Sequence, residues 1–499
     1  MPALYYLHPA NHLTIDKLTD ILNAQLALST EAVQALEKSY LFLKECLEKN
    51  PNALYGINTG FGSLCNTIIS DTELSTLQHN LLLSHACGTG EWVPLPIVKI
   101  MLLLKIQALI YGYSAVRKEV VERLITLYNA NLLPVVYTQG SLGASGDLAP
   151  LAHLCLPLIG EGKIWSNGNL YSTAEIYAQM NLEPLQLEPK EGLALLNGTQ
   201  FMLAYGYYIL LHLNKLEKWA DIIATLSLDA FACCQEPFAE ALHRIRPHKG
   251  QQITAHRIRI LRAASSIANA PSVHVQDPYS FRCIPQVHGA VKDALEWVST
   301  IMQTEAASVS DNPSIFPEER QVLAGGNFHG QQLALALDTL AIAMTYLGSI
   351  AERRIYQLLS GTRNLPPFLS PKPGLNSGFM ILQYTAAALV NQNQHLCYPS
   401  SVASIPSSNG QEDYVSMGAN SATKAYTILE NLKTILAIEL MHASQALYFR
   451  LPQKTSPLLE AILDDFRQQV PIASTDRIFS HDITVAKKFL DTYEINHIF

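Results

Sequence analysis

The sequence predicts a mainly α-helical protein, with a core bundle of long helices and a smaller mixed domain at the N-terminal end. Two observations predict this fold class. Apolar residues recur at helical spacing over segments longer than the usual helix of a globular protein. Of the 499 residues, 48% are hydrophobic and only 15% are charged, which indicates a large buried surface. We expect residues 1–113 to form the N-terminal domain and residues 114–499 to form the elongated helical bundle.

The N-terminal domain is expected to be mixed because helical segments alternate with glycine-rich loops. Apolar spacing predicts helices over residues 15–28 and 30–48. A glycine-studded loop at residues 54–62 carries Tyr55, and His85 precedes a second glycine turn. Taken alone, these loops are ordinary turns with an aromatic side chain and a helix-end histidine.

The rest of the chain is dominated by helical patterns, several of which exceed the usual helix length and indicate a bundle. Acidic residues inside two of the apolar segments, Asp338 and Glu352, need partners if they are buried. No repeat of twenty to fifty residues is visible, which argues against a solenoid. The predicted helices cover residues 116–130, 198–234, 289–307, 331–359, 380–391 and 419–449.

A loop at residues 140–150, Gly-Ser-Leu-Gly-Ala-Ser-Gly-Asp-Leu-Ala-Pro, is the most distinctive segment. Its three glycines allow positive φ and close backbone approach, and an apolar helical pattern follows. We expect Asp147 to cap that helix or to lie in its first turn. The loop lacks the Lys-Ser/Thr ending of a phosphate-binding loop, and Asp147 stands where a hydrolase nucleophile elbow needs glycine.

The run from Gly143 to His153 resembles the signature of the aromatic amino-acid ammonia-lyases, and in particular the histidine ammonia-lyase family. This resemblance implies an ammonia-lyase type of fold and a prosthetic group, methylidene-imidazolone (MIO), formed autocatalytically from Ala144, Ser145 and Gly146. The residue types suit that chemistry. The Gly146 nitrogen must reach the Ala144 carbonyl carbon, which requires a compressed backbone. The Ser145 hydroxyl can leave as water.

Other motifs, far apart in the chain, match the same family. The run at residues 55–62 matches a family motif whose tyrosine is catalytic, which assigns that role to Tyr55. By the same resemblance His85 recognises the substrate, and Asn197, in Asn-Gly-Thr-Gln, bonds the prosthetic ring. Jointly these motifs are far more specific than any one of them.

The segment at residues 275–283 also matches the family. The resemblance implies that Arg282 binds the substrate carboxylate, for which a planar bidentate donor is well suited. It places Tyr279 on a mobile lid and Gln276 near the ring. Phe328, in Gly-Gly-Asn-Phe-His, corresponds to an aromatic residue that packs beside the ring.

Glu412 lies in an acidic motif where histidine lyases carry a glutamate and phenylalanine lyases usually carry a glutamine. A carboxylate can accept the N–H of an imidazole or pair with imidazolium. A phenyl ring would leave that charge buried and unpaired. Two neighbours depart from the usual pattern: Gly410 replaces a residue with a side chain, and Tyr414 replaces a frequent histidine.

The predicted reaction is therefore the removal of ammonia from L-histidine to give trans-urocanate. Tyr55 is the first choice for the base that takes the β-proton, and Tyr279 or Glu412 are the alternatives. A tyrosine ammonia-lyase or a 2,3-aminomutase using the same group is the main alternative, since His85 could also bind a phenol. An inactive helical scaffold fits poorly with the intact motifs. A metal hydrolase fits poorly because His-Glu-x-x-His is absent, and we expect no metal.

Composition limits the partners. The net charge of −8 argues against nucleic acid or an anionic membrane as a partner. No signal-peptide pattern is visible at residues 1–18, apolar segments contain charged residues, and the eight cysteines form no Cys-x-x-Cys. We therefore expect a cytoplasmic protein with reduced thiols. The apolar composition predicts an oligomer, and the resemblance implies a homotetramer whose active sites draw on several subunits.

Overall fold

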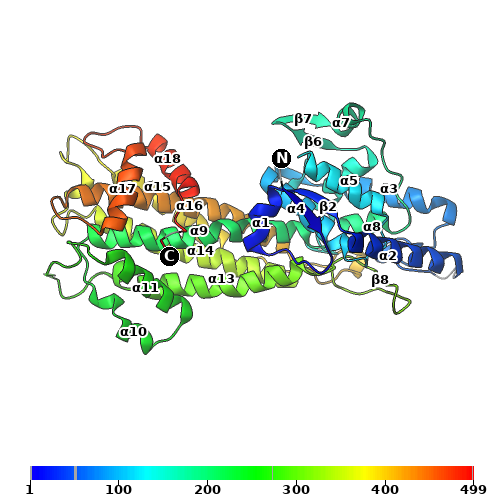
Figure 1. Cartoon of the computed structure of the whole chain (residues 1–499), viewed down its shortest axis with the longest axis horizontal. Coiled ribbons are helices and arrows are strands. Elements are labelled where there is room, and N and C mark those ends of the chain that lie inside the picture. The colour runs from blue at the N-terminus through cyan, green and yellow to red at the C-terminus, as the bar shows by residue number, and fades with distance from the viewer. Residues whose placement is uncertain (1–2, 50–52, 272–273, 497) are drawn as a thin grey trace. The chain divides into compact units, whose positions relative to one another are not determined.

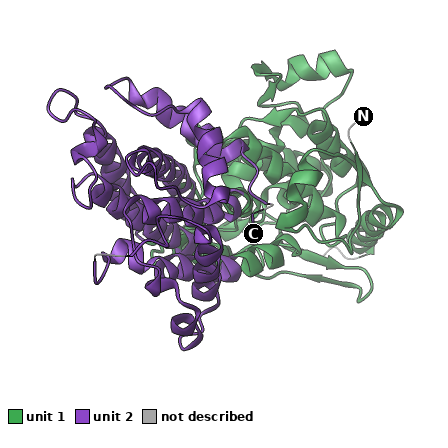
Figure 2. Ribbon diagram, turned by 60° about the vertical axis from the view of Figure 1, so that its left-hand side comes forward, with its two compact units in different colours: residues 1–211, 299–338, 399–423 green, residues 212–298, 339–398, 424–499 purple. Residues whose placement is uncertain are grey.

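The computed structural model describes residues 3–49, 53–271, 274–496 and 498–499, and the chain divides into two units (Figures 1 and 2). Unit 1 contains residues 1–211, 299–338 and 399–423. Unit 2 contains residues 212–298, 339–398 and 424–499. The predicted boundary after residue 113 falls inside unit 1, because helices on both sides of that position pack against one another.

Unit 1 combines helices with small β-sheets. Its helices are α1 (Ile15–Leu22), α2 (Thr30–Lys49), α3 (Leu74–His85), α4 (Leu95–Ile110), α5 (Lys118–Asn129), α6 (Leu148–Cys155), α7 (Thr173–Met180) and α8 (Glu191–Leu196). Its strands are β1 (Leu4–Leu7), β2 (Gln25–Leu28), β3 (Thr89–Trp92), β4 (Leu133–Pro134), β5 (Tyr137–Gln139), β6 (Lys163–Ser166), β7 (Asn169–Ser172), β8 (Ser314–Phe316) and β9 (Gln321–Leu323).

The predicted helix over residues 15–28 is wrong in its second half. Helix α1 ends at Leu22, and β2 then pairs in parallel with β1. The Asn129 side chain bonds both the nitrogen and the oxygen of Leu26, at 2.7 and 2.9 Å. These long-range hydrogen bonds favour an extended backbone over the local helical pattern.

The remaining three sheets are antiparallel. Strand β3 pairs with β5, and β8 pairs with β9. The third sheet has the strand order β4-β6-β7. Helix α7 follows β7 directly and starts with a complete capping box, in which Ser172 and Glu175 satisfy each other's backbone nitrogens. Helix α4 is the apolar centre of unit 1, because every residue from Ile100 to Ile110 is buried.

The predicted long helices are confirmed with small shifts at their ends, and four of them contribute residues to both units. These four are α9 (Gln200–Ala230), α13 (Ile284–Ala306), α14 (Gln331–Leu358) and α16 (Gly418–Tyr448). The helices wholly within unit 2 are α10 (Glu240–Arg244), α11 (Lys249–Arg262), α12 (Tyr279–Arg282), α15 (Met380–Leu396), α17 (Pro457–Gln469) and α18 (Phe479–Thr492).

Unit 2 has a helical core in which buried charges are paired. Glu439 of α16 accepts hydrogen bonds from Arg354 of α14, at 2.6 and 2.9 Å, and from Ser227 of α9, at 2.8 Å. Glu352 accepts a hydrogen bond from Gln383, at 2.6 Å. In unit 1, Asp338 accepts one from the Ser401 nitrogen, at 2.8 Å. Both acids that the sequence placed inside apolar helices therefore have the partners that burial requires.

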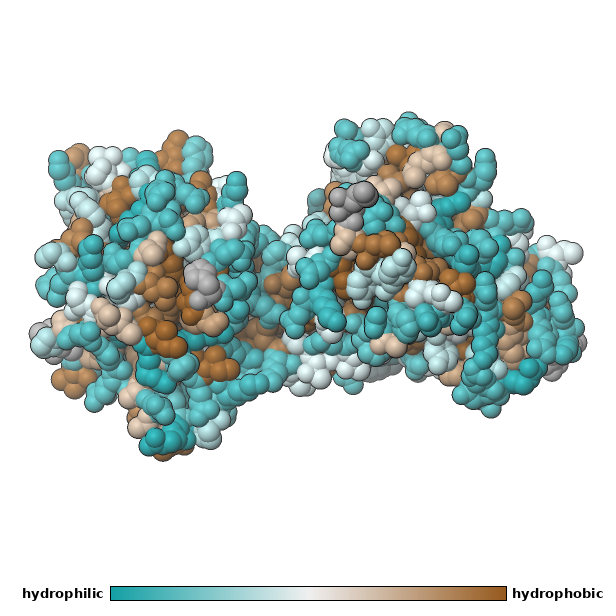
Figure 3. All heavy atoms as spheres, viewed as in Figure 1, coloured by the Kyte–Doolittle hydropathy of each residue, from teal (hydrophilic) through white to brown (hydrophobic). Residues whose placement is uncertain are grey.

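Within the described residues, one helix, α14, is long and apolar enough to cross a membrane, and most of its apolar part is buried inside the protein. Such burial is typical of a core helix. In the face shown in Figure 3, hydrophobic residues also gather in surface patches on each unit. In unit 2, large apolar side chains are exposed on α14 and α15, namely Tyr346, Tyr356, Ile381 and Tyr384.

Candidate active site

The glycine-rich loop connects β5 to α6 in unit 1, and its backbone is compressed. Gly143, Ser145 and Gly146 all have positive φ, at 79°, 52° and 79°. This region is unfavourable for serine, so Ser145 is held in a strained conformation. At Gly146, a Cβ atom would lie only 2.2 Å from the Gly198 oxygen, so no side chain fits there. The small residues of this loop are therefore required by its geometry.

Asn197 brings a second segment against the loop. It ends the short helix α8, and its side-chain Nδ2 donates a 2.5 Å hydrogen bond to the Ser145 carbonyl oxygen. The next residue, Gly198, pairs with Gly146 in a parallel bridge and accepts a 2.7 Å hydrogen bond from the Asp147 nitrogen. The structure therefore brings Asn197 into contact with the tripeptide.

Asp147 is the N-cap residue of α6, as expected, but its side chain makes no capping hydrogen bond to that helix. Its Oδ2 instead accepts a 3.0 Å hydrogen bond from the Met202 nitrogen, in the first turn of α9, and Oδ1 accepts one from the Ser141 hydroxyl. Burial raises the pKa of this carboxyl to about 7. Asp147 therefore joins the loop to the start of α9.

Glu412 lies beside Ser145 although it is far away in the sequence. The Ser145 hydroxyl donates a 3.3 Å hydrogen bond to Glu412 Oε1. The Ser407 hydroxyl donates to Oε2 at 3.2 Å, and the backbones of Ser407 and Glu412 form an antiparallel bridge. The turn between them therefore fixes the carboxylate in front of the loop.

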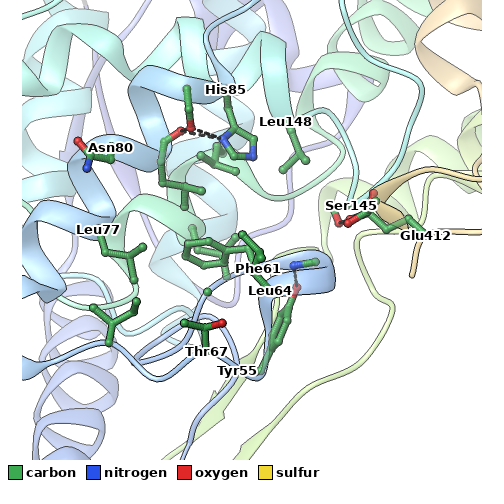
Figure 4. A pocket seen from close by; sticks show the side chains of 18 residues that line it. Tyr55, Phe61, Leu64, Thr67, Leu77, Asn80, His85, Ser145, Leu148 and Glu412 are labelled. Atoms are coloured by element: carbon green, nitrogen blue, oxygen red, sulfur yellow. Dashed lines mark hydrogen bonds between the residues drawn. The ribbon is translucent and has the colours of Figure 1, made fainter. Parts of the chain in front are cut away.

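A cavity of about 590 Å³ opens on this side of the loop and brings four predicted site residues together: Tyr55, His85, Ser145 and Glu412 (Figure 4). Ser145 and Glu412 lie together at one side, whereas Leu77 and Asn80 lie at the other. Most of the remaining lining is apolar, including Leu64, Ile69 and Leu81. A smaller cavity of about 250 Å³ touches Ala144 and Gly146 and shares His85 and Glu412 with the first.

His85 ends helix α3, and its protonation state follows from its partners. Nδ1 lies 2.8 Å from the Leu81 carbonyl oxygen, which can only accept, so Nδ1 carries the proton. Burial lowers the pKa of the imidazole, although the nearby Glu412 opposes this. This shift favours the neutral imidazole, in which Nδ1 carries the proton and Nε2 is a hydrogen-bond acceptor.

Tyr55 lies in the predicted glycine-studded loop, and its phenol oxygen accepts a 3.5 Å hydrogen bond from the Gly62 nitrogen. Burial raises the pKa of Tyr55, the hydrogen bond from Gly62 lowers it, and the charge of Glu412 raises it again. Overall, the pKa of Tyr55 is raised. Within one chain, Tyr55 therefore lacks the lowered pKa that suits a proton acceptor at neutral pH.

Five predicted residues lie outside these two cavities: Asn197, described above, and four others. Gln276, Tyr279 and Arg282 belong to unit 2, where Tyr279 is 71% exposed and the Arg282 guanidinium stacks on its ring at 4.5 Å. The buried Arg282 Nε has no hydrogen-bond partner among the described residues. Phe328 is half-buried in unit 1, between β9 and α14, and lines neither cavity.

The two residues that depart from the family pattern also lie outside both cavities. Tyr414 is 62% exposed and stacks on His329, with ring centroids 6.1 Å apart. Gly410 has a φ of 83°, a conformation that favours glycine, and a Cβ atom there would meet open space. Neither substitution therefore changes the lining around Glu412.

Sequence reasoning missed Lys105 of helix α4. This side chain is 1% exposed and donates hydrogen bonds to the carbonyl oxygens of Ala194 and Asn197, at 3.1 and 3.0 Å. Burial lowers the pKa of its ammonium group to about 8. The available signal was a lysine inside a mostly apolar helix, which also carries Lys99, but sequence alone could not show which group Lys105 meets.

Comparisons with known proteins identify the family of the chain. The profile of the family described as aromatic amino acid lyase matches residues 13–468. A histidine ammonia-lyase from Geobacillus sp. (strain WCH70) is 44% identical, over 96% of this chain and 95% of that protein. The crystal structure of histidine ammonia-lyase from Trypanosoma cruzi superposes with a TM-score of 0.91 at 38% identity, covering 98% of this chain and 93% of that one. A tyrosine aminomutase from Streptomyces globisporus superposes with a TM-score of 0.92 at 34% identity, covering 98% and 97%.

Proposed function

The chain belongs to the aromatic amino acid lyase family, and from that premise we propose that it removes ammonia from L-histidine to give trans-urocanate. One observation carries the choice of site: Ser145, held with positive φ, contacts Glu412 through its hydroxyl and Asn197 through its carbonyl oxygen. The identity of 44% to histidine ammonia-lyases across nearly the whole chain supports the choice of substrate.

We further propose that Ala144, Ser145 and Gly146 form MIO. The residues present fit this group, because the loop is compressed at Ser145 and Gly146 and leaves no room for a side chain at Gly146. When formed, the group supplies an electrophilic carbon that captures the substrate amine and makes ammonia a better leaving group. The Asn197 amide donates to the Ser145 carbonyl oxygen, which is conjugated to that carbon, and so withdraws electrons from it.

His85 and Glu412 recognise the substrate side chain in this proposal. Both line the larger cavity, and both present acceptors, the neutral His85 Nε2 and the Glu412 carboxylate. An imidazole N–H can donate to such a group, and the apolar lining accommodates the ring carbons. A phenyl ring has no N–H and would leave the carboxylate unpaired, at a cost of a few kcal/mol, about 2–5.

The base that removes the β-proton is proposed to be Tyr55, with Tyr279 and Glu412 as alternatives. Tyr55 reaches the cavity, but burial and Glu412 raise its pKa in the single chain. Tyr55 therefore needs a cation close to its oxygen in the working enzyme. The bound amino group and Arg282 are the cations that the proposal provides.

We propose a homotetramer in which several subunits share each active site. Arg282 has the role of holding the substrate carboxylate, and its buried Nε lacks a partner among the described residues. Tyr279 and Gln276 are exposed, as expected for residues that act at a surface where chains meet. The exposed tyrosines of α14 and α15 offer apolar area for such contacts.

The direct test offers the purified protein L-histidine, L-tyrosine and L-phenylalanine and follows the ultraviolet absorbance of each conjugated acid. We expect L-histidine to be consumed fastest and urocanate to be the product. Preferential consumption of L-tyrosine, or formation of a β-amino acid from it, would instead favour the tyrosine lyase or aminomutase alternative, consistent with the similar tyrosine aminomutase structure.

A further inference from the structure

Lys105 is a buried cation that the proposed reaction does not use directly. It lies on α4, where the neighbouring residues Leu103, Leu104 and Ile106 are all apolar and buried. Among the described residues no carboxylate forms an ion pair with it, in contrast to Lys190, which pairs with Asp311 at 2.5 Å. Burying an unpaired ammonium group costs several kcal/mol unless hydrogen bonds compensate for the lost water.

The compensation comes from the end of helix α8. The last carbonyl groups of a helix have no partner within the helix, and they carry the negative end of its dipole. Lys105 Nζ donates to two carbonyl oxygens there, Ala194 at 3.1 Å and Asn197 at 3.0 Å. Because the two bonds converge from one ammonium group, they fix both the helix end and the backbone of the residue that follows it.

That residue is Asn197, whose side chain contacts the loop. Its Nδ2 lies 2.5 Å from the Ser145 carbonyl oxygen, and its Oδ1 is buried without a hydrogen-bond partner among the described residues. No other side-chain hydrogen bond of Asn197 therefore holds the amide in place. The direction of the amide depends on the backbone of Asn197, and Lys105 holds the carbonyl oxygen of that backbone.

We propose that Lys105 is a positioning residue, which holds the Asn197 amide against the Ser145 carbonyl oxygen and thereby supports both cyclisation of the tripeptide and the activity of the finished site. This inference rests on the proposed function. A donor to the Ser145 oxygen acts only when it is aimed at that oxygen, because such electrostatic stabilisation depends on a fixed geometry. Lys105 lines neither cavity, and its hydrogen bonds go to Ala194 and Asn197, so it acts through Asn197.

The test compares Lys105→Met, Lys105→Gln and a matched control, Lys99→Met, in the full-length protein. Lys99 lies on the same helix, half-buried, with its ammonium group over the Tyr128 ring. The first readout is the intact mass of each purified chain. Closing the ring and dehydrating Ser145 each release one water molecule, so a cyclised chain is lighter by two water molecules.

We expect wild type and Lys99→Met to be fully cyclised, whereas both Lys105 variants retain the two water molecules on a substantial fraction of chains. For the cyclised fraction, we expect kcat to fall about tenfold, less than the roughly 100-fold that loss of a donor can cause. KM should stay within about twofold, because no substrate contact is removed. Circular dichroism checks that each variant is folded. If Lys105→Met does not accumulate as folded protein, the test uses Lys105→Gln.

Folded Lys105 variants that are fully cyclised and have an unchanged kcat would overturn this inference and leave the proposed function intact. A loss of stability in the Lys105 variants with normal cyclisation and an unchanged kcat would also overturn it, since it would show a purely structural role. A wild-type chain that is active but carries the unmodified mass would instead overturn the proposed prosthetic group.

Discussion

At the scale of single residues, Ser145 is the side chain on which the proposed electrophile depends. Replacing it by alanine removes the hydroxyl that leaves as water, so no methylidene carbon can form. We expect Ser145→Ala to lower turnover of L-histidine by at least about 1,000-fold. The fold should be kept, because the substitution removes from the uncyclised chain only one 3.3 Å side-chain hydrogen bond, from the Ser145 hydroxyl to Glu412. An undiminished rate in this variant would contradict the proposed chemistry.

Glu412 is expected to set selectivity. Glu412→Gln keeps the shape of the side chain but removes its charge, and a hydrogen bond to a charged group contributes about 1.5–3 kcal/mol. We therefore expect kcat/KM for L-histidine to fall about 10- to 100-fold while the value for L-phenylalanine falls less.

The matched control for this experiment is Asp413→Asn, since Asp413 is exposed and lines neither cavity. It should leave the ratio of the two kcat/KM values unchanged. If Glu412→Gln lowers kcat/KM equally for both amino acids, the carboxylate does not recognise the imidazole ring.

The sequence predicted much of the candidate site because its motifs are local runs with strict steric needs. Tyr55, His85, Ser145 and Glu412 do line one cavity. The partners of Asp147 and Lys105 could not be predicted, because each bonds a backbone group that is distant in sequence, the Met202 nitrogen and the Asn197 oxygen. Backbone groups carry no sequence signal, so such contacts require the fold.

At the scale of secondary-structure elements, the long helices were predictable and the short elements were less so. Helix α14 was expected over residues 331–359 and spans Gln331–Leu358. Its apolar pattern continues over many turns, and tertiary packing stabilises the helix. Strand β2, in contrast, exists because it pairs with β1 and with Asn129. A four-residue element with only two-stranded pairing has too little local pattern to be distinguished from a helix end.

Helix α16 carries a buried histidine that should make stability depend on pH. Burial lowers the pKa of His442 to about 4, although its hydrogen bond to the Ile438 oxygen opposes this. The unfolded chain has a histidine pKa near 6.5. Between these values the unfolded state binds a proton that the folded state does not, so the free energy of unfolding falls as pH drops from about 6.5 towards about 4.

Replacing His442 by phenylalanine should therefore reduce the loss of melting temperature between pH 7 and pH 5. The same substitution at His395, which is exposed on α15, is the matched control and should leave the loss unchanged. Identical losses in wild type and in His442→Phe would show that His442 is protonated in the folded state or that other groups dominate this pH range.

At the scale of the whole molecule, sharing of active sites between chains can be tested by complementation. Ser145→Ala and Arg282→Ala should each be nearly inactive when expressed alone. If Ser145 and Arg282 of one site come from different chains, co-expression produces some sites with both residues intact. We expect activity well above the sum of the two separate variants, measured as urocanate formation at equal protein concentration. Activity equal to that sum would place both residues of each site on a single chain.

The intact mass of purified, active protein tests the central claim most directly, because it reports the chemical state of the tripeptide without any substrate. Mass spectrometry of the chain, and of a proteolytic peptide containing residues 140–150, should give a mass lower than that of the encoded sequence by two water molecules. In Ser145→Ala the full deficit should be absent. A fully active chain whose tripeptide has the unmodified mass would contradict the claim that Ala144, Ser145 and Gly146 form the reagent that captures the amino group.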